Sequence, residues 1–148
     1  YRNHNGGIML QGGKDNVVEN NIFVDGKVSQ VYIANFDNNS TGQQFVRNIV
    51  YYTDPKSALI AAGRVDENVI RSDYNLYFVA GGGEPQVPGI GPFSAWQKLG
   101  FDAHSIVADP LFVNPQADDY SLRPESPAFR LGFKAIDTGR IGLTRRQP

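Results

Sequence analysis

Three asparagines recur at a constant spacing in the first half of the chain, and this repeat limits the possible folds more than any other feature. Asn21, Asn48 and Asn75 lie 27 residues apart, and each begins a short run of β-branched, leucine or aromatic residues. Two further runs of the same kind precede each copy, one set at 7–11, 31–35 and 59–63, the other at 16–19, 44–47 and 68–71. Self-similarity at such a period is typical of a solenoid.

The composition of the repeat selects one class of solenoid. No segment of the repeat shows the spacing of i, i+3, i+4 and i+7 that helical repeats need, and leucines are too few for a leucine-rich repeat. Three short β-type runs per unit instead predict an all-β fold, a right-handed parallel β-helix of about three coils with a C-terminal cap. The asparagines would then stack in a column at one corner and hydrogen-bond along the axis. The alternative is that these asparagines only favour turns.

The alternation of apolar residues predicts which side chains face inward in the first set of runs. The inward columns are predicted to be Ile8/Val31/Leu59 and Leu10/Ile33/Ala61, and the outward columns Met9/Tyr32/Ile60 and Gln11/Ala34/Ala62.

Proline, glycine and charge divide the rest of the chain. We expect coils over 1–79, a Gly/Pro-rich loop over 80–92, a cap segment over 93–133 and a basic tail over 134–148. The cap contains a predicted short helix that follows Pro92 and stops at Gly100, with Ser94 as its N-cap. Phe93, Trp96 and Leu99 would form its apolar face, with Trp96 closing the end of the solenoid.

Composition excludes several classes of function. The chain has no cysteine, which rules out disulfides, thiolate metal sites and a cysteine nucleophile. Its net charge of −1 argues against nucleic acid as a partner, because such surfaces need clustered excess base. No apolar run approaches the roughly 20 residues that span a bilayer, so we expect no membrane partner.

The second half carries a pattern that extends the fold prediction. Trp96, Gly100-Phe-Asp102, His104-Ser105, Asp109-Pro-Leu-Phe112, Asp119-Tyr-Ser-Leu122 and Ser126-Pro-Ala128, together with the asparagine repeat, resemble the C-terminal coils and cap of bacterial right-handed parallel β-helix repeat proteins. Many such proteins are polysaccharide lyases or glycoside hydrolases, and others have no assigned activity. The resemblance implies a secreted or periplasmic, carbohydrate-active protein with a polysaccharide as partner. Because family members usually have more coils, it also implies a piece of a longer enzyme. No catalytic motif of the family matches residue by residue.

The candidate site residues come from the edge of the first set of runs. Aligning the coils places Lys14 level with Asp37, and Arg64 and Asp66 nearby, so that they form a predicted acid/base and uronate-binding cluster. Asp37, Arg64, Asp66 and His4 are the catalytic candidates; Lys14 and Tyr32 are the candidates for substrate binding. The alternative is a solvated turn with ordinary surface ion pairs, and a module that binds carbohydrate or a protein partner without catalysis.

No cofactor is expected, although clustered acidic residues at Asp37, Asp66-Glu67 and Asp118-Asp119 leave calcium possible. No spacing matches a metal-binding loop, so no metal ligand is assigned. His104, beside Asp102 and Ser105, is interpreted as a structural hydrogen-bond partner rather than part of a triad, because no nucleophile elbow is present. The apolar first coil is expected to pair with another chain, as in a homo-oligomer, or to be covered by residues 1–6 or the tail.

Overall fold

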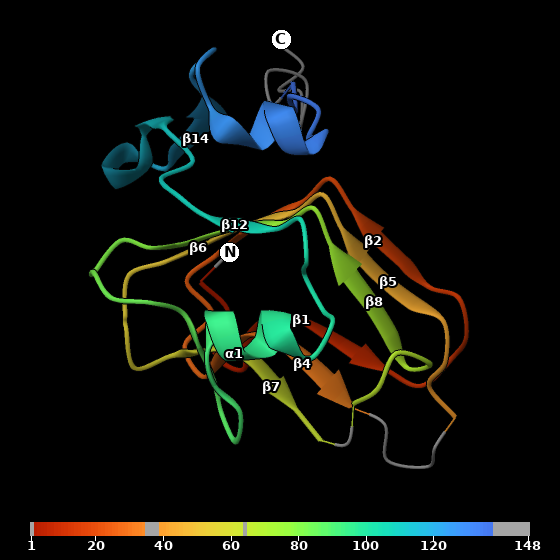
Figure 1. The fold of residues 1–148 in the computed structure, drawn as a ribbon. Helices are drawn as coiled ribbons and strands as arrows, with labels where there is room; N and C mark the ends of the chain where they lie inside the picture. The colour runs from red at the N-terminus through yellow and green to blue at the C-terminus, as the bar shows by residue number, and fades with distance from the viewer. Residues whose placement is uncertain (1, 35–38, 64, 138–148) are drawn as a thin grey trace, which may run out of the picture.

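The computed structural model describes residues 2–34, 39–63 and 65–137. Its chain winds as a parallel β-solenoid of about four turns, in which three sheets surround an apolar interior (Figure 1). Equivalent strands of successive coils pair in parallel throughout these sheets. The predicted all-β parallel β-helix is therefore confirmed, with one more turn than expected.

The three sheets are built from one strand per coil. The first contains β1 (Gly6–Gln11), β4 (Ser29–Ala34) and β7 (Ala58–Ala62). The second contains β2 (Val17–Glu19), β5 (Gln43–Val46) and β8 (Ile70–Asp73). The third contains β3 (Ile22–Val24), β6 (Ile49–Tyr52), β9 (Leu76–Val79) and β12 (Ile106–Val107). β12 lies within the range assigned above to the cap.

The predicted asparagine column exists and forms a hydrogen-bonded ladder. The Nδ2 of Asn21 donates to Asn48 Oδ1 (3.1 Å), and the Nδ2 of Asn48 donates to Asn75 Oδ1 (3.2 Å). The backbone N–H groups of Asn21 and Asn48 donate to the same two oxygens. The ladder continues to Asp102, another 27 residues on, whose Oδ1 accepts from Asn75 Nδ2 (3.0 Å). Side-chain amides thus satisfy backbone groups at a corner where the strand ladder is interrupted.

The predicted columns of the first sheet are right for two coils and wrong for the third. Val31 pairs with Ile8 as expected, but on its other side it pairs with Ile60 rather than Leu59. Leu59 and Ile60 are both buried, at 0% and 2% exposure. When neighbouring residues are both buried, alternation no longer distinguishes one register from the next.

The second sheet corrects the alignment in a similar way. Val18, Phe45 and Ser72 form one column, so the constant offset of 27 residues extends back from the ladder into this sheet. The similarity of the runs at 16–19, 44–47 and 68–71 suggested other pairings, which are wrong. Lys14 lies in register with Thr41 and not with Asp37. The connection between β4 and β5 is longer than that between β1 and β2, which shifts the later residue.

A short helix closes one end of the solenoid. After the hairpin of β10 (Gln86–Val87) and β11 (Gly91–Pro92), α1 (Phe93–Lys98) lies across the interior, and Trp96 is 1% exposed and stacks on Phe101. Pro92 rather than Ser94 is the N-cap. The N–H of Ser94 instead donates to the carboxylate of Glu84. Leu99 is 60% exposed and does not belong to the apolar face.

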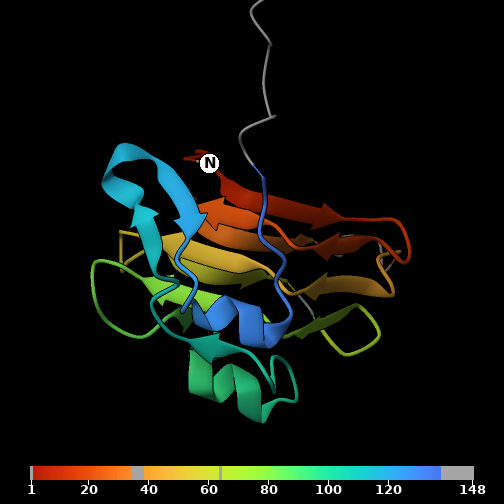
Figure 2. The same cartoon turned by 90° about the horizontal axis from the view of Figure 1, so that it is seen from above.

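The remaining cap packs outside the third sheet, as Figure 1 shows. It contains β13 (Phe112–Asn114), η1 (Pro115–Ala117), β14 (Asp119–Leu122) and η2 (Pro127–Leu131). Its apolar residues Phe112, Ala128 and Phe133 cover the outward side chains of β6 and β9, forming a second core. Figure 2 shows the coils stacked from the N-terminal side to α1 at the opposite end.

Candidate functional site

The structure separates the predicted site residues. Asp37 and Arg64 lie outside the described residues. Asp66 is on the turn before β8, where its Oδ1 accepts the N–H groups of Asn68 (2.9 Å) and Val69 (3.2 Å). His4 is exposed on the segment that precedes β1, and Lys14 is exposed at the corner between β1 and β2.

Tyr32 lies elsewhere, half-buried in the middle of β4 between Met9 and Ala61. It lines a groove of about 550 Å³ beside the first coil, whereas Asp66 lines a different groove. The described candidates therefore do not form the single cluster that the alignment predicts.

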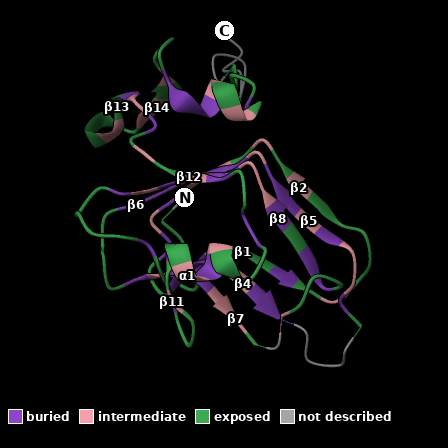
Figure 3. Cartoon of the chain, in the orientation of Figure 1, coloured by how far each residue is buried: buried purple, intermediate pink, exposed green. Residues whose placement is uncertain are grey.

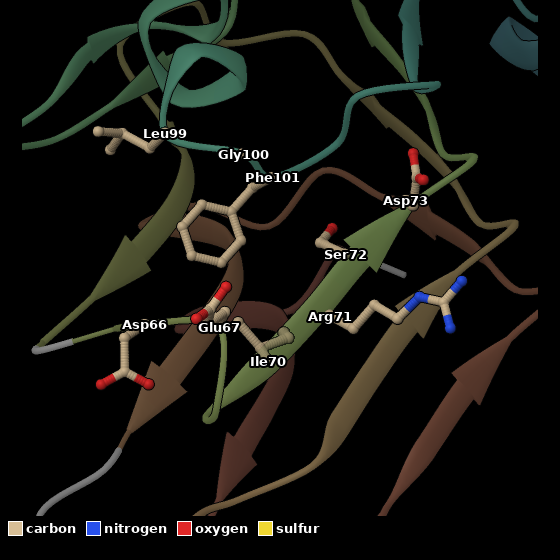
Figure 4. Close-up of a pocket in the computed structure, with 9 residues that line it drawn as sticks. All are labelled: Asp66, Glu67, Ile70, Arg71, Ser72, Asp73, Leu99, Gly100 and Phe101. Atoms are coloured by element: carbon tan, nitrogen blue, oxygen red, sulfur yellow. The ribbon is translucent and has the colours of Figure 1, made fainter.

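The groove that contains Asp66 lies beside β8, the last strand of the second sheet (Figure 4). It has a volume of about 560 Å³ and lies between β8 with its preceding turn and the segment that follows α1. Its lining residues are Asp66, Glu67, Ile70, Arg71, Ser72, Asp73, Leu99, Gly100 and Phe101. Charged and aromatic groups therefore meet in one open groove at the capped end of the solenoid.

Alternation along β8 sorts the charged side chains from the apolar ones. Ile70 and Ser72 are buried, whereas Arg71 is exposed and Asp73 is partly exposed. Figure 4 shows Arg71 directed away from the Phe101 ring. Residues two apart on a strand share a face, so the guanidinium and the carboxylate stand side by side on the outer surface of the sheet.

Asp73 holds the imidazole of His104. Its Oδ2 lies 2.8 Å from His104 Nδ1, and its Oδ1 accepts the backbone N–H groups of His104 (2.7 Å) and Tyr74 (2.9 Å). The His104 ring stacks on Tyr74 with centroids 4.8 Å apart and planes 5° apart. The imidazole is thus fixed on one side by a carboxylate and on one face by a ring.

The environment of this pair favours a charged carboxylate. Burial acts to raise the pKa of Asp73, but the hydrogen bonds from the His104 side chain, the His104 backbone and the Tyr74 backbone outweigh it, and the pKa is lowered. His104 is 61% exposed, while Asp73 is 15% exposed. An imidazole whose Nδ1 bonds to a carboxylate has Nε2 left for another partner, which is the arrangement of an oriented general base.

Asp102 and Ser105 have a separate, structural role. Asp102 is fully buried and accepts from Trp96 Nε1 (2.8 Å), Tyr77 Oη (3.0 Å) and the Ser105 hydroxyl. The Ser105 hydroxyl also accepts the N–H of Asn75. Because neither residue bonds to His104, the three do not form a triad, in agreement with the prediction. The structural hydrogen bond of His104 goes to Asp73 instead.

The search for metal and membrane features gives two findings. Within residues 2–34, 39–63 and 65–137, no three acidic or histidine side chains come together as a metal site. No helix in the part of the chain that the structure describes is long and apolar enough to cross a membrane.

Sequence reasoning missed Arg71, Asp73 and His104. A signal existed, because Asp102 continues the spacing of 27 residues after Asn75. One further coil on that spacing would have placed His104 level with the end of β8. The signal was overlooked because the ladder position changes from an asparagine to an aspartate, and because the helix interrupts the repeat.

Comparisons with known proteins add no assignment. The chain matches no family model, no curated protein and no solved structure.

Proposed function

We propose that the chain is a carbohydrate-active β-solenoid protein of the polysaccharide lyase type, with its site on the outer face of β8. The observation that carries this proposal is the Asp73-bound imidazole of His104 next to the guanidinium of Arg71. A lyase needs a base to remove a proton beside a uronate carboxylate and a cation to neutralise that carboxylate. His104 and Arg71 supply these two groups.

The proposed reaction is a β-elimination in which the protein provides a base and a charge. His104 Nε2 takes the proton from the ring carbon that bears the carboxylate, while Arg71 stabilises the negative charge that develops there. The electron pair forms a double bond to the neighbouring carbon as that carbon loses its bond to the glycosidic oxygen. The departing oxygen takes a proton from water or from the imidazolium. Asp73 stabilises the imidazolium formed in the first step.

Hydrolase chemistry is supported less well by the same groove. A glycosidase places two carboxyl groups on opposite sides of the scissile bond, roughly 5–9 Å apart. Asp66 and Glu67 are adjacent on one turn, and Asp66 is engaged in bonding the backbone of that turn. This arrangement favours a structural role for Asp66.

A non-catalytic carbohydrate-binding module is the second candidate, and the groove beside the first coil favours it. This groove is lined by the half-buried ring of Tyr32, the exposed Met9 and Val28, and the amides of Asn3 and Asn5. An aromatic ring bordered by amide groups suits the apolar face and the hydroxyls of a sugar.

Lyase activity is tested on a panel of acidic and neutral polysaccharides by the ultraviolet absorbance of the unsaturated product. We expect turnover of a uronate polymer, and the variant His104→Gln should lower the rate at least about a hundredfold. Arg71→Gln should lower it as well, whereas Lys56→Gln, an exposed cation on another loop, should not. Circular dichroism establishes that each variant is folded.

The two candidates give different results in the same experiments. Absence of product from every polymer, or an unchanged rate in folded His104→Gln, overturns the lyase proposal. Retarded migration of the chain in a polysaccharide gel without any product, abolished by Tyr32→Ala and not by Arg71→Gln, supports the binding module instead.

A further inference from the structure

The asparagine ladder has a direction, and its first member is incomplete. Asn48 Oδ1 accepts two bonds from the coil before it, from the backbone N–H and the Nδ2 of Asn21. Asn75 Oδ1 accepts the same two bonds from Asn48. Within the described ranges, no residue donates to Asn21 Oδ1. The ladder therefore begins with an acceptor that lacks both of the donors its equivalents have.

The edge beside this acceptor is a groove. Asn21 borders a groove of about 720 Å³ between β3 and the chain segments of β14 and residues 133–136. Its apolar wall includes Ile22, Phe23, Leu122 and Phe133. Figure 2 shows β3 on the N-terminal side of the stack, at the opposite end from α1. Backbone groups on the outer edge of β3 face this groove, because β6 pairs with its other edge.

The chain covers only the last part of this edge. The N–H of Arg2 donates to Val24 O (2.7 Å), and Asn3 O accepts from Lys27 N (3.1 Å). Lys134 exchanges two hydrogen bonds with the side chain of Asn20 on the other side. Between these contacts, Asn21 to Phe23 remain next to the groove. The expectation that residues 1–6 or the tail cover the first coil is met at its margins.

We propose that this groove binds an extended strand of another polypeptide, parallel to β3, which places an asparagine over Asn21. The backbone N–H and Nδ2 of that asparagine donate to Asn21 Oδ1, and the following apolar residues pair with Ile22 and Phe23. The chain contains a sequence that makes this contact, because Asn48-Ile49-Val50 pairs in this way with Asn75, Leu76 and Tyr77. The partner is thus a β-solenoid coil or a peptide with the same pattern.

The ladder argues against a second copy of this chain as the partner. The Nδ2 of Asn21 already donates to Glu19 O (2.9 Å) and to Asn48 Oδ1, so two first coils facing each other bring two acceptors together. At the other end of the chain, Asp102 terminates the ladder with a carboxylate that lies buried beneath Trp96. Neither end of a second copy offers the missing donors.

The test uses a labelled peptide of residues 43–50, which contains the Asn48 phrase and ends before the position that Arg2 holds. We expect saturable binding to the full chain by fluorescence anisotropy. Replacing the peptide's asparagine with alanine removes two hydrogen bonds and should weaken binding about tenfold or more. Asn21→Ala in the protein should weaken it similarly, whereas Asn16→Ala, an exposed asparagine at another corner of the same coil, should not.

Three results would overturn the proposal. The first is no saturable binding of the peptide to the folded chain. The second is equal affinity for the asparagine and alanine peptides. The third is a dimer in light scattering that the peptide does not dissociate and that Asn21→Ala abolishes, because a second copy then occupies the groove. Lyase activity does not enter any of these measurements, so the two proposals stand or fall separately.

Discussion

Asp102 is a buried carboxylate that connects the ladder to the cap. Its two oxygens accept from the Asn75 amide, the Tyr77 and Ser105 hydroxyls and the Trp96 indole. A buried charge is tolerated only where hydrogen bonds replace the lost water, and four donors do so here. The carboxylate and its burial also raise the pKa of the Tyr77 hydroxyl, with burial as the larger cause. Tyr77 is therefore a hydrogen-bond donor at every pH at which the chain is folded.

Removing this carboxylate should destabilise the chain strongly. Asp102→Ala leaves the buried donors of Asn75, Tyr77 and Trp96 without their partner and opens a cavity, so we expect a loss of about 3–5 kcal/mol in the free energy of unfolding. Urea denaturation followed by tryptophan fluorescence measures it. Glu67→Ala, an exposed acidic residue, is the control and should change stability by less than about 0.5 kcal/mol. Similar values for the two variants would contradict this account.

The Asp73–His104 pair should make stability depend on pH. The pKa of Asp73 is lower in the folded chain than the ordinary value, so its contribution is present above the ordinary pKa and is lost as the pH falls through the folded pKa. Asp73→Asn should therefore cost about 1 kcal/mol at pH 6 and almost nothing near pH 2. Urea unfolding at both pH values checks this. A cost that is larger at the acidic pH would show that the sign is wrong.

Single residues differ in how well the sequence predicts them. The ladder asparagines are predictable because a constant spacing fixes their position on the coil. Asp73 and His104 come together only because the chain turns once more after residue 79 and brings 102–105 back to β8. That turn contains a helix and a loop of its own, so its length follows no repeat. Local patterns therefore find the scaffold and miss the pair.

Elements show the same division. The strands of the coils follow from short apolar runs, yet their register depends on burial that adjacent residues share, as at Leu59 and Ile60. The helix α1 was predicted from its apolar spacing and its glycine stop. Its N-cap was not, because the carboxylate of Glu84, ten residues away, bonds the N–H of Ser94 in place of a local cap. Pairing between distant segments decided each of these details.

The helix α1 should stabilise the solenoid through one face only. Trp96 is 1% exposed, stacks on Phe101 at 4.1 Å and bonds Asp102, so Trp96→Ala should cost about 3–5 kcal/mol. Leu99 follows directly after the helix but is 60% exposed, and Leu99→Ala should cost less than about 0.5 kcal/mol. Thermal unfolding followed by circular dichroism compares the two variants. Equal destabilisation would mean that Leu99 packs on the interior after all.

The whole molecule is asymmetric along its axis. At one end α1, Phe101 and Asp102 close both the interior and the ladder. At the other end the first coil has a neighbour on one side only, apart from the contacts of Arg2, Asn3 and Lys134. In a solenoid each coil is stabilised mainly by the coils next to it. The proposed reactive face lies near the closed end and the proposed docking groove lies at the open end, so rigidity and accessibility are distributed to suit both roles.

This asymmetry predicts a gradient of local stability that hydrogen exchange measures. The N–H of Leu76 donates to Asn48 O between coils that are flanked on both sides, whereas the N–H of Asp25 donates to Tyr51 O from the first coil. Leu76 should exchange at least about tenfold more slowly than Asp25, because the open coil separates from the stack without disturbing the others. The N–H of Ala108, which donates to Tyr77 O in the last coil, should exchange more slowly than Asp25, since the cap adjoins that coil. Equal protection at all three would show that the coils open only together, and the first coil would then be no weaker than the interior. Binding of the peptide proposed above should slow Asp25 and leave Leu76 unchanged, because the added strand supplies the neighbour that the first coil lacks.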